Sequence, residues 1–261
     1  MLFAAPLPPL LLATSLAIVF AAGIVRGFSG FGFSALSVAG LALLIAPARV
    51  VPAIFVLEVL ASIGLLRTAV RDIDRHWLSW LALGNALCIP LGIVVLAWLP
   101  EAPLRLLIGA LLALAALALR GGFSVTLAPT PRVRLIVGMV SGFANGMAAI
   151  GGIAVAVLLS AASITPAALR ATLIALFLFT DLYALACAAA VSAFTNAPLD
   201  LLGPDTLRWV VWLTPVMAAG IWVGHRSFAG VSPERFSQHV LNLLIVIATV
   251  SVLRSLFDLL G

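Results

Sequence analysis

The chain contains no lysine, and only 9% of its 261 residues carry a charge. A soluble globular domain carries about 25% charged residues, so most of this surface cannot face water. Hydrophobic residues make up 64% of the chain, and the mean hydropathy is +1.28. The apolar runs are long and continuous, without the alternation of a membrane-spanning β-barrel. Because backbone groups in lipid must be satisfied within their own segment, the composition predicts an all-α, polytopic membrane protein.

Cysteine, histidine and clustered basic residues are also scarce. Cys88 and Cys187 both lie in apolar segments, and we interpret them as small core residues rather than a disulfide. The three histidines have neither metal-ligand nor catalytic spacing, so no metal, cofactor or catalytic site is expected. Ser141 has no histidine at a corresponding depth, which argues against an intramembrane serine protease. The net charge of +5 comes from arginines at the ends of apolar runs, as in topology determinants, so nucleic acid is not an expected partner.

Two short apolar patches, in contrast, contain closely spaced glycines. The patches read Arg26-Gly27-Phe28-Ser29-Gly30-Phe31-Gly32 and Gly142-Phe143-Ala144-Asn145-Gly146. Each leads into an apolar stretch and then a proline. The two halves align at a constant offset, which places Gly32 on Gly151 and Pro47 on Pro166. Helix interruptions at matching positions in two halves are the best sequence indication of a transporter's binding site.

Apolar runs and helix breakers divide each half into a broken hairpin and three spans. In the first half, 1–125, the hairpin is expected at 10–46 and the spans at 51–66, 77–99 and 104–119. In the second half, 126–261, the hairpin is expected at 135–161 and the spans at 169–194, 207–224 and 236–256. The segment Leu135–Asn145 would reach only about 16 Å, half of the hydrocarbon core. Each hairpin is therefore expected to consist of half-helices or of a pair of tilted helices.

Arginine placement predicts the orientation. The arginine-rich loops hold Arg67, Arg71 and Arg75, then Arg120, Arg132 and Arg134, and finally Arg226 and Arg235. By the positive-inside rule these loops are cytoplasmic. The first hairpin then has both ends outside and the second has both ends inside, so the halves form inverted repeats, as in secondary carriers. Both chain termini are predicted outside, and the first segment, which lacks a positively charged leader region, is expected to be retained. The alternative is a plain helical bundle in which glycines only allow close packing.

The two patches, with their following prolines, resemble the two repeats of the TauE/SafE sulfite exporter family of membrane permeases. Pro103-Leu104-Arg105 and Pro233-Glu234-Arg235, which open the last helix of each half, fit the same pattern. The resemblance covers the whole chain. It implies a permease of the bacterial inner membrane for a small anion such as sulfite, an organosulfonate or a related organic acid.

The glycine patches are the predicted substrate site. A half-helix that starts within the membrane offers free N–H groups and a positive dipole end to an anion. The candidate binding residues are Arg26, Gly27, Ser29, Gly30, Gly32, Asn145, Gly146 and Gly151. Ser29 is placed as the N-cap of the second half-helix, with Asn145 and Gly146 in the corresponding place of the second half. In the alternative interpretation, Ser29 and Asn145 are only caps and turn formers.

Arg26 is the charged residue of the first patch. At the tip of a re-entrant hairpin its guanidinium would lie near the midplane, where a charge is costly and usually functional. Its bidentate fork suits a sulfonate or carboxylate. If the first segment spans the membrane fully, Arg26 is instead an interfacial anchor.

Glu58 and Asp181 lie inside the spans that follow the hairpins. Carboxylates at that depth must be protonated, paired or next to water. They are candidates for a counter-ion to Arg26, a proton carrier or a Na⁺ ligand, and our preferred hypothesis is a carboxylate that releases Arg26 on protonation. Asp181 has a structural alternative, a hydrogen bond to Thr180 or Tyr183. Arg49 and Arg170 lie just beyond Pro47 and Pro166, as interfacial anchors or as residues that attract anions at the two entrances.

The sequence as a whole therefore predicts a secondary transporter that works by alternating access, with lipid and a small anion as its partners. An anion channel is the first alternative, and a non-transporting membrane enzyme or interaction protein is the second.

Overall fold

The computed structural model describes residues 8–120, 130–160, 164–195, 202–226 and 233–260, which contain helices and no strand. The helices are α1 (Pro9–Ser29), α2 (Phe33–Leu41), α3 (Pro47–Ala69), α4 (Arg75–Trp98), α5 (Glu101–Arg120), α6 (Pro131–Ala148), α7 (Gly151–Ser160), α8 (Pro166–Phe194), α9 (Pro204–Arg226) and α10 (Pro233–Leu260), with the short 3₁₀-helix η1 (Val70–Asp72) between α3 and α4. Six of them, α1, α3, α4, α5, α8 and α9, are long and apolar enough to cross a membrane. The predicted all-α membrane fold is confirmed.

Proline and polar caps set where these helices begin. Pro47 and Pro166 occupy the first turns of α3 and α8, where the missing N–H costs nothing. The Thr165 hydroxyl accepts a hydrogen bond from the Ala168 N–H at the start of α8. The two matched prolines, Pro47 and Pro166, therefore mark the starts of α3 and α8.

The chain reverses between α1 and α2 through two glycines in the left-handed region. Gly30 has φ of 82° and Gly32 has φ of 88°, values that glycine adopts without a steric cost. In the second half the corresponding turn contains Ala149, at φ 57°. Each predicted hairpin is thus a long helix followed by a short one. α6 starts one turn before its predicted beginning, at Pro131, and continues past Asn145 to Ala148, whereas α1 starts at Pro9, one residue before its predicted beginning.

The predicted caps of the short helices are wrong. Gly32, not Ser29, precedes α2. Ser29 lies in the last turn of α1, where its hydroxyl can reach the Val25 carbonyl oxygen at 2.8 Å; such a contact to the preceding turn is common for serine in helices. Asn145 and Gly146 are inside α6, because that helix continues to Ala148.

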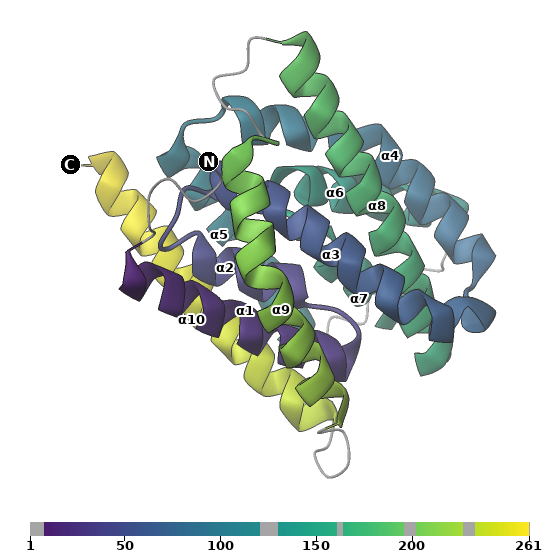
Figure 1. Cartoon of the computed structure of the whole chain (residues 1–261). Coiled ribbons are helices and arrows are strands. Elements are labelled where there is room, and N and C mark those ends of the chain that lie inside the picture. The colour runs from purple at the N-terminus through teal and green to yellow at the C-terminus, as the bar shows by residue number, and fades with distance from the viewer. Residues whose placement is uncertain (1–7, 121–129, 161–163, 196–201, 227–232, 261) are drawn as a thin grey trace.

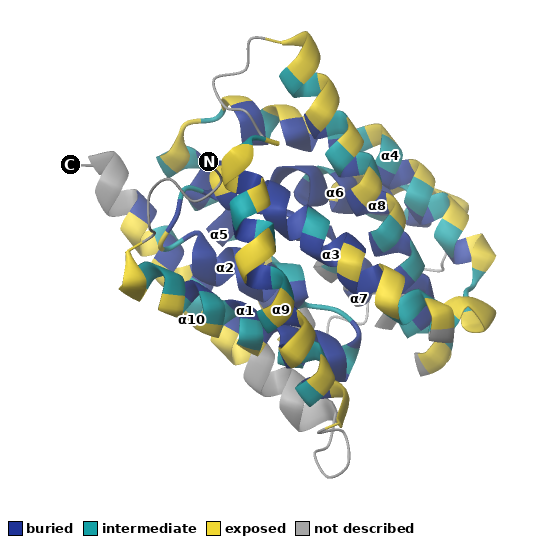
Figure 2. Cartoon of the chain, viewed as in Figure 1, coloured by how far each residue is buried: buried dark blue, intermediate teal, exposed yellow. Residues whose placement is uncertain are grey.

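The main helix pairs each join a helix of the first half to a helix of the second (Figure 1). α1 packs against α9, and α6 packs against α4. α3 and α8 pack against each other between these pairs, and α5 packs against α10. α2 is buried almost throughout, whereas the outward faces of α4, α8 and α9 expose many large apolar side chains (Figure 2). This pattern suits a lipid environment.

Glycines bring two of these helix pairs into backbone contact. A Cβ atom added at Gly27 of α1 would lie 2.2 Å from the Ile221 carbonyl oxygen of α9. A Cβ atom added at Gly146 of α6 would lie 2.3 Å from the Ile89 carbonyl oxygen of α4. Close approach through small residues is typical of membrane helices. Both glycines therefore have a packing role.

Candidate functional site

Arg26 lies in the last turn of α1 with its side chain completely buried. Its Nη2 atom is 3.0 Å from Oε2 of Glu58 and donates a hydrogen bond to Oγ of Ser62, also at 3.0 Å. Glu58 and Ser62 are one turn apart on α3 and are themselves buried. Arg26 is therefore held inside the protein and is not an exposed interfacial anchor.

The same Glu58 carboxylate reaches the start of α2. Its Oε1 atom accepts a hydrogen bond from the Ser34 N–H at 3.2 Å. A helix N-terminus favours negative charge, because its first N–H groups have no partner within the helix. The position at which the sequence predicts a bound anion is thus occupied by a carboxylate of the protein itself.

Phe177 of α8 covers the other side of Arg26. The Arg26 guanidinium carbon lies 4.9 Å from the centroid of the Phe177 ring, a cation–π distance. The ring also lies against Gly152 at the start of α7, where an added Cβ would be 2.4 Å from it. Phe177 therefore separates Arg26 from the beginning of the second short helix.

Asn145 and Asp181 form a second buried pair beside this cluster. The Asn145 side-chain amide donates to Oδ1 of Asp181 at 2.9 Å. Asp181 lies one helical turn after Phe177 on α8, and Phe177 lies over Arg26, so the two pairs belong to one buried polar cluster. Asp181 has Asn145 as its partner rather than the Thr180 or Tyr183 suggested by the sequence.

The offset that aligns the glycine patches also relates the residues of this cluster. It places Arg26 on Asn145, Ser62 on Asp181, and Glu58 on Phe177. Arg26 contacts Ser62, and Asn145 contacts Asp181. The Glu58 side chain, from α3, contacts the start of α2, and the Phe177 side chain, from α8, contacts the start of α7. Sequence reasoning missed Ser34, Ser62 and Phe177, although this offset would have indicated the last two.

Ser141 and Asn85 hold the second break in place. The Ser141 hydroxyl lies 3.1 Å from Oδ1 of Asn85 on α4 and 3.0 Å from the Gly151 carbonyl oxygen, with geometry to donate to either. An added Cβ at Gly151 would lie 2.3 Å from the Ser141 carbonyl oxygen, so only glycine fits. These contacts of the Ser141 hydroxyl bring α4, α6 and α7 together immediately beside Asn145. The sequence contained no signal for them beyond the presence of polar residues in apolar segments.

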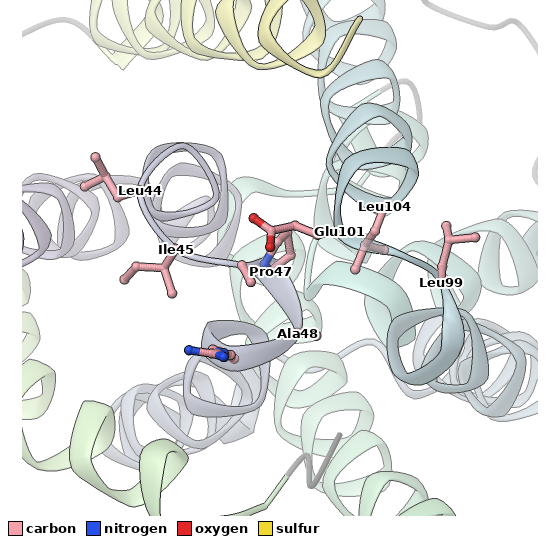
Figure 3. A pocket seen from close by; sticks show the side chains of 9 residues that line it. Leu44, Ile45, Pro47, Ala48, Leu99, Glu101 and Leu104 are labelled. Carbon is pink, nitrogen blue, oxygen red and sulfur yellow. The ribbon is translucent and has the colours of Figure 1, made fainter. Parts of the chain in front are cut away.

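A cavity of about 400 Å³ lies elsewhere, at the end of the bundle where α3 and α5 begin (Figure 3). Leu44–Arg49, Leu99, Glu101 and Leu104 line it. Arg105 pairs with Glu101 and donates from Nε to the Ala42 carbonyl oxygen at 2.6 Å, which fixes the chain after α2. Neither Arg26 nor Glu58 lines this cavity. The predicted entrance residue Arg49 does.

Within the described ranges, no three histidine, cysteine, aspartate or glutamate side chains are grouped to hold a metal ion. The site is thus a buried ion pair at a helix N-terminus, between the two breaks. Such an arrangement can bind a charged group, and one carboxylate is already paired to the arginine.

Comparison with known proteins agrees with this architecture. The family model described as sulfite exporter TauE/SafE matches residues 15–252. No curated protein matches the chain, and no solved structure matches it. Because the family model covers nearly the whole chain, the protein belongs to the TauE/SafE sulfite exporter family and is a multi-pass membrane transporter rather than an enzyme.

Proposed function

We propose that this protein is a secondary carrier for a small oxyanion, such as sulfite or an organosulfonate, with Arg26 as the principal binding residue. The observation that carries the proposal is the double contact of Glu58. Its two carboxylate oxygens meet the Arg26 guanidinium and the Ser34 N–H. These are the contacts that a substrate oxyanion would need, so Glu58 occupies the site as an internal counter-ion.

Arg26 retains capacity for a ligand. Its Nε and Nη1 atoms are buried and have no hydrogen-bond partner among the described residues. A buried guanidinium with unsatisfied N–H groups is costly, and an oxyanion can satisfy two of them at once. Ser29, Gly30 and Gly32 form the turn between Arg26 and α2 and complete the proposed site in the first half. Asn145 and Gly151 form its counterpart in the second half, while Gly27 and Gly146 pack the supporting helices.

We propose that a proton couples to the anion through Glu58. When a proton binds the Glu58 carboxylate, the negative charge that neutralises Arg26 is lost, and the incoming anion replaces it. Anion and proton then move together, and the site never holds an uncompensated charge. Asp181, whose partner is Asn145 rather than Arg26, keeps the second half of the site hydrogen-bonded. Na⁺ in place of the proton is the alternative for coupling.

We also propose alternating access around this site by two inverted repeats, residues 1–125 and 126–261. Recurrent helix contacts and the matched positions of Arg26 and Asn145 support this arrangement. The pairs α1–α9 and α4–α6 would move as rigid units, since their backbones are in contact at Gly27 and Gly146. The arginine-rich loops would face the cytoplasm, with both termini outside the inner membrane.

Flux into proteoliposomes tests the proposal. Purified wild-type protein should take up labelled sulfite with saturation, and should show counterflow when unlabelled sulfite is inside. Arg26→Lys should reduce the apparent affinity, because an ammonium keeps the charge without the planar fork. Ion currents that rise with concentration without saturation would instead favour an anion channel. Absence of flux for sulfite, sulfonates and carboxylates would reject this class of substrate.

A further inference from the structure

Arg170 lies on the same face of α8 as two members of the buried cluster. It precedes Phe177 by about two helical turns and Asp181 by about three. Residues at these spacings share one side of a helix. The side of α8 that meets Arg26 through Phe177 therefore carries a second arginine closer to the beginning of the helix.

The stem of Arg170 crosses the turn that follows Arg26. A Cβ atom added at Gly30 would lie 2.8 Å from Cγ and 3.0 Å from Nε of Arg170. Gly30 follows Arg26 by one helical turn, and its N–H donates to the Arg26 carbonyl oxygen at 2.8 Å. Gly30 thus leaves the room through which Arg170 approaches Arg26. Arg170 therefore carries a second positive charge to the turn next to Arg26, and like charges held near each other repel.

Arg170 has no compensating charge within the part of the chain that the structure describes. It forms no ion pair or hydrogen bond with another described residue. Arg26, next to it, is paired to Glu58 through one nitrogen and leaves Nε and Nη1 without partners. An oxyanion with two or more acceptor oxygens can bond to both guanidinium groups and relieve their repulsion.

The location of Arg170 shows which end of the helix bundle leads to Arg26. The Asp74 N–H, at the turn between α3 and α4, donates to Oγ1 of Thr172 at 3.0 Å. Arg170 is therefore near the end of the bundle that contains this turn. Its side chain is half-buried, whereas that of Arg26 is completely buried. Arg170 thus lies between this end of the bundle and Arg26.

We propose that Arg170 is a second anion-binding residue, which receives an oxyanion at the end of the bundle near the α3–α4 turn and transfers it past Gly30 to Arg26. The inference rests on the proposed function of Arg26. It names the ligand class as a small oxyanion that can bridge two guanidinium groups. A halide of the same charge, which has no separate acceptor oxygens, should bind less well.

The first test measures sulfite binding to purified protein by calorimetry. Arg170→Gln should weaken binding about tenfold, the value of one charge-assisted hydrogen bond. Arg75→Gln is the matched control, because it removes an exposed arginine at the start of α4 and should leave the Kd unchanged. If Arg170→Gln does not fold, Arg170→Lys replaces it and should weaken binding severalfold. A wild-type Kd in the folded variant would overturn the inference.

The second test locates the residue on the pathway. The chain has two cysteines, so Arg170→Cys and Arg75→Cys can each be placed in a background with Cys88→Ala and Cys187→Ala. A membrane-impermeant thiol reagent should label both new cysteines from the same side, and an organosulfonate, which does not consume the reagent as sulfite would, should slow the labelling of the first alone. Equal labelling rates with and without the organosulfonate would overturn the transfer pathway.

These tests separate the two proposals. If Arg26→Lys weakens sulfite binding while Arg170→Gln does not, the role of Arg170 is rejected and the proposed function stands. If Arg26→Lys binds sulfite like the wild type, the proposed function itself is rejected.

Discussion

One carboxylate oxygen of Glu58 lies 3.0 Å from Nη2 of Arg26, and neither side chain reaches the surface. The other oxygen accepts a hydrogen bond from the first turn of α2. Glu58 therefore joins three helices, α1, α2 and α3, through a single charge. Any change in that charge alters the Arg26 guanidinium and the Ser34 N–H, the two groups best suited to hold an anion.

Replacing Glu58 with glutamine tests the coupling. In the wild type, sulfite affinity should increase as the pH falls, because protonation of Glu58 frees Arg26. In Glu58→Gln the amide oxygen can still accept from Ser34, but the competing charge is gone. We expect a lower KM for uptake and a flattened pH dependence, measured in proteoliposomes across an imposed pH gradient. An unchanged pH profile would show that the proton binds elsewhere.

Replacing Asp181 with asparagine gives the contrasting result. Asn145 donates to Asp181, and an asparagine side chain at position 181 can still accept this hydrogen bond. Because Arg26 keeps Glu58 as its partner, we expect Asp181→Asn to retain the pH dependence of sulfite uptake. If the pH dependence were lost in Asp181→Asn and retained in Glu58→Gln, the proton would be assigned to Asp181.

Removal of the Arg26 side chain should affect stability as well as transport. Arg26→Ala leaves the Glu58 carboxylate buried without its ion-pair partner, which typically costs about 3–5 kcal/mol. The double variant Arg26→Gln with Glu58→Gln contains no unpaired charge, so its melting temperature should lie closer to the wild type. Sulfite flux should be lost in both. Thermal unfolding in detergent and flux assays on the same preparations separate the two effects.

Glycine substitutions test the helix contacts. Gly27→Ala places a methyl group 2.2 Å from the Ile221 carbonyl oxygen, so α1 and α9 must separate. Gly64 on α3 has no atom within 4 Å of an added Cβ, and Gly64→Ala is the matched control. We expect a lower melting temperature for Gly27→Ala. For Gly64→Ala we expect an unchanged melting temperature, or a higher one if the better helix propensity of alanine adds about 0.5–1 kcal/mol to the free energy of unfolding. Equal melting temperatures would mean that the α1–α9 contact contributes little.

Much of the fold follows from local properties of the chain. Apolar runs, prolines and paired glycine patches place the helices and the two breaks, because helix formation and helix interruption depend on nearby residues. α6 is longer than predicted at both ends, since Pro131 starts it one turn before Leu135 and it continues past Asn145 to Ala148. The cap of α2 was misassigned because a serine hydroxyl can either cap the helix that follows it or bond to a carbonyl oxygen of the turn before it. The left-handed backbone at Gly30 and Gly32 places the start of α2 after Gly32, so Ser29 bonds to the preceding turn.

The sequence by itself determined that this chain is an all-α membrane protein, because long apolar runs in lipid must satisfy their backbone groups within each segment. It also singled out Arg26 and two carboxylates, because a charge in apolar surroundings is costly. Only the tertiary structure decided which carboxylate pairs with Arg26, that Phe177 lies over the guanidinium, and that Gly27 and Gly146 serve packing. These outcomes depend on which helix faces meet. Nearly every face of an apolar chain is hydrophobic, so close packing of glycine against backbone, rather than hydrophobicity, selects the contacts.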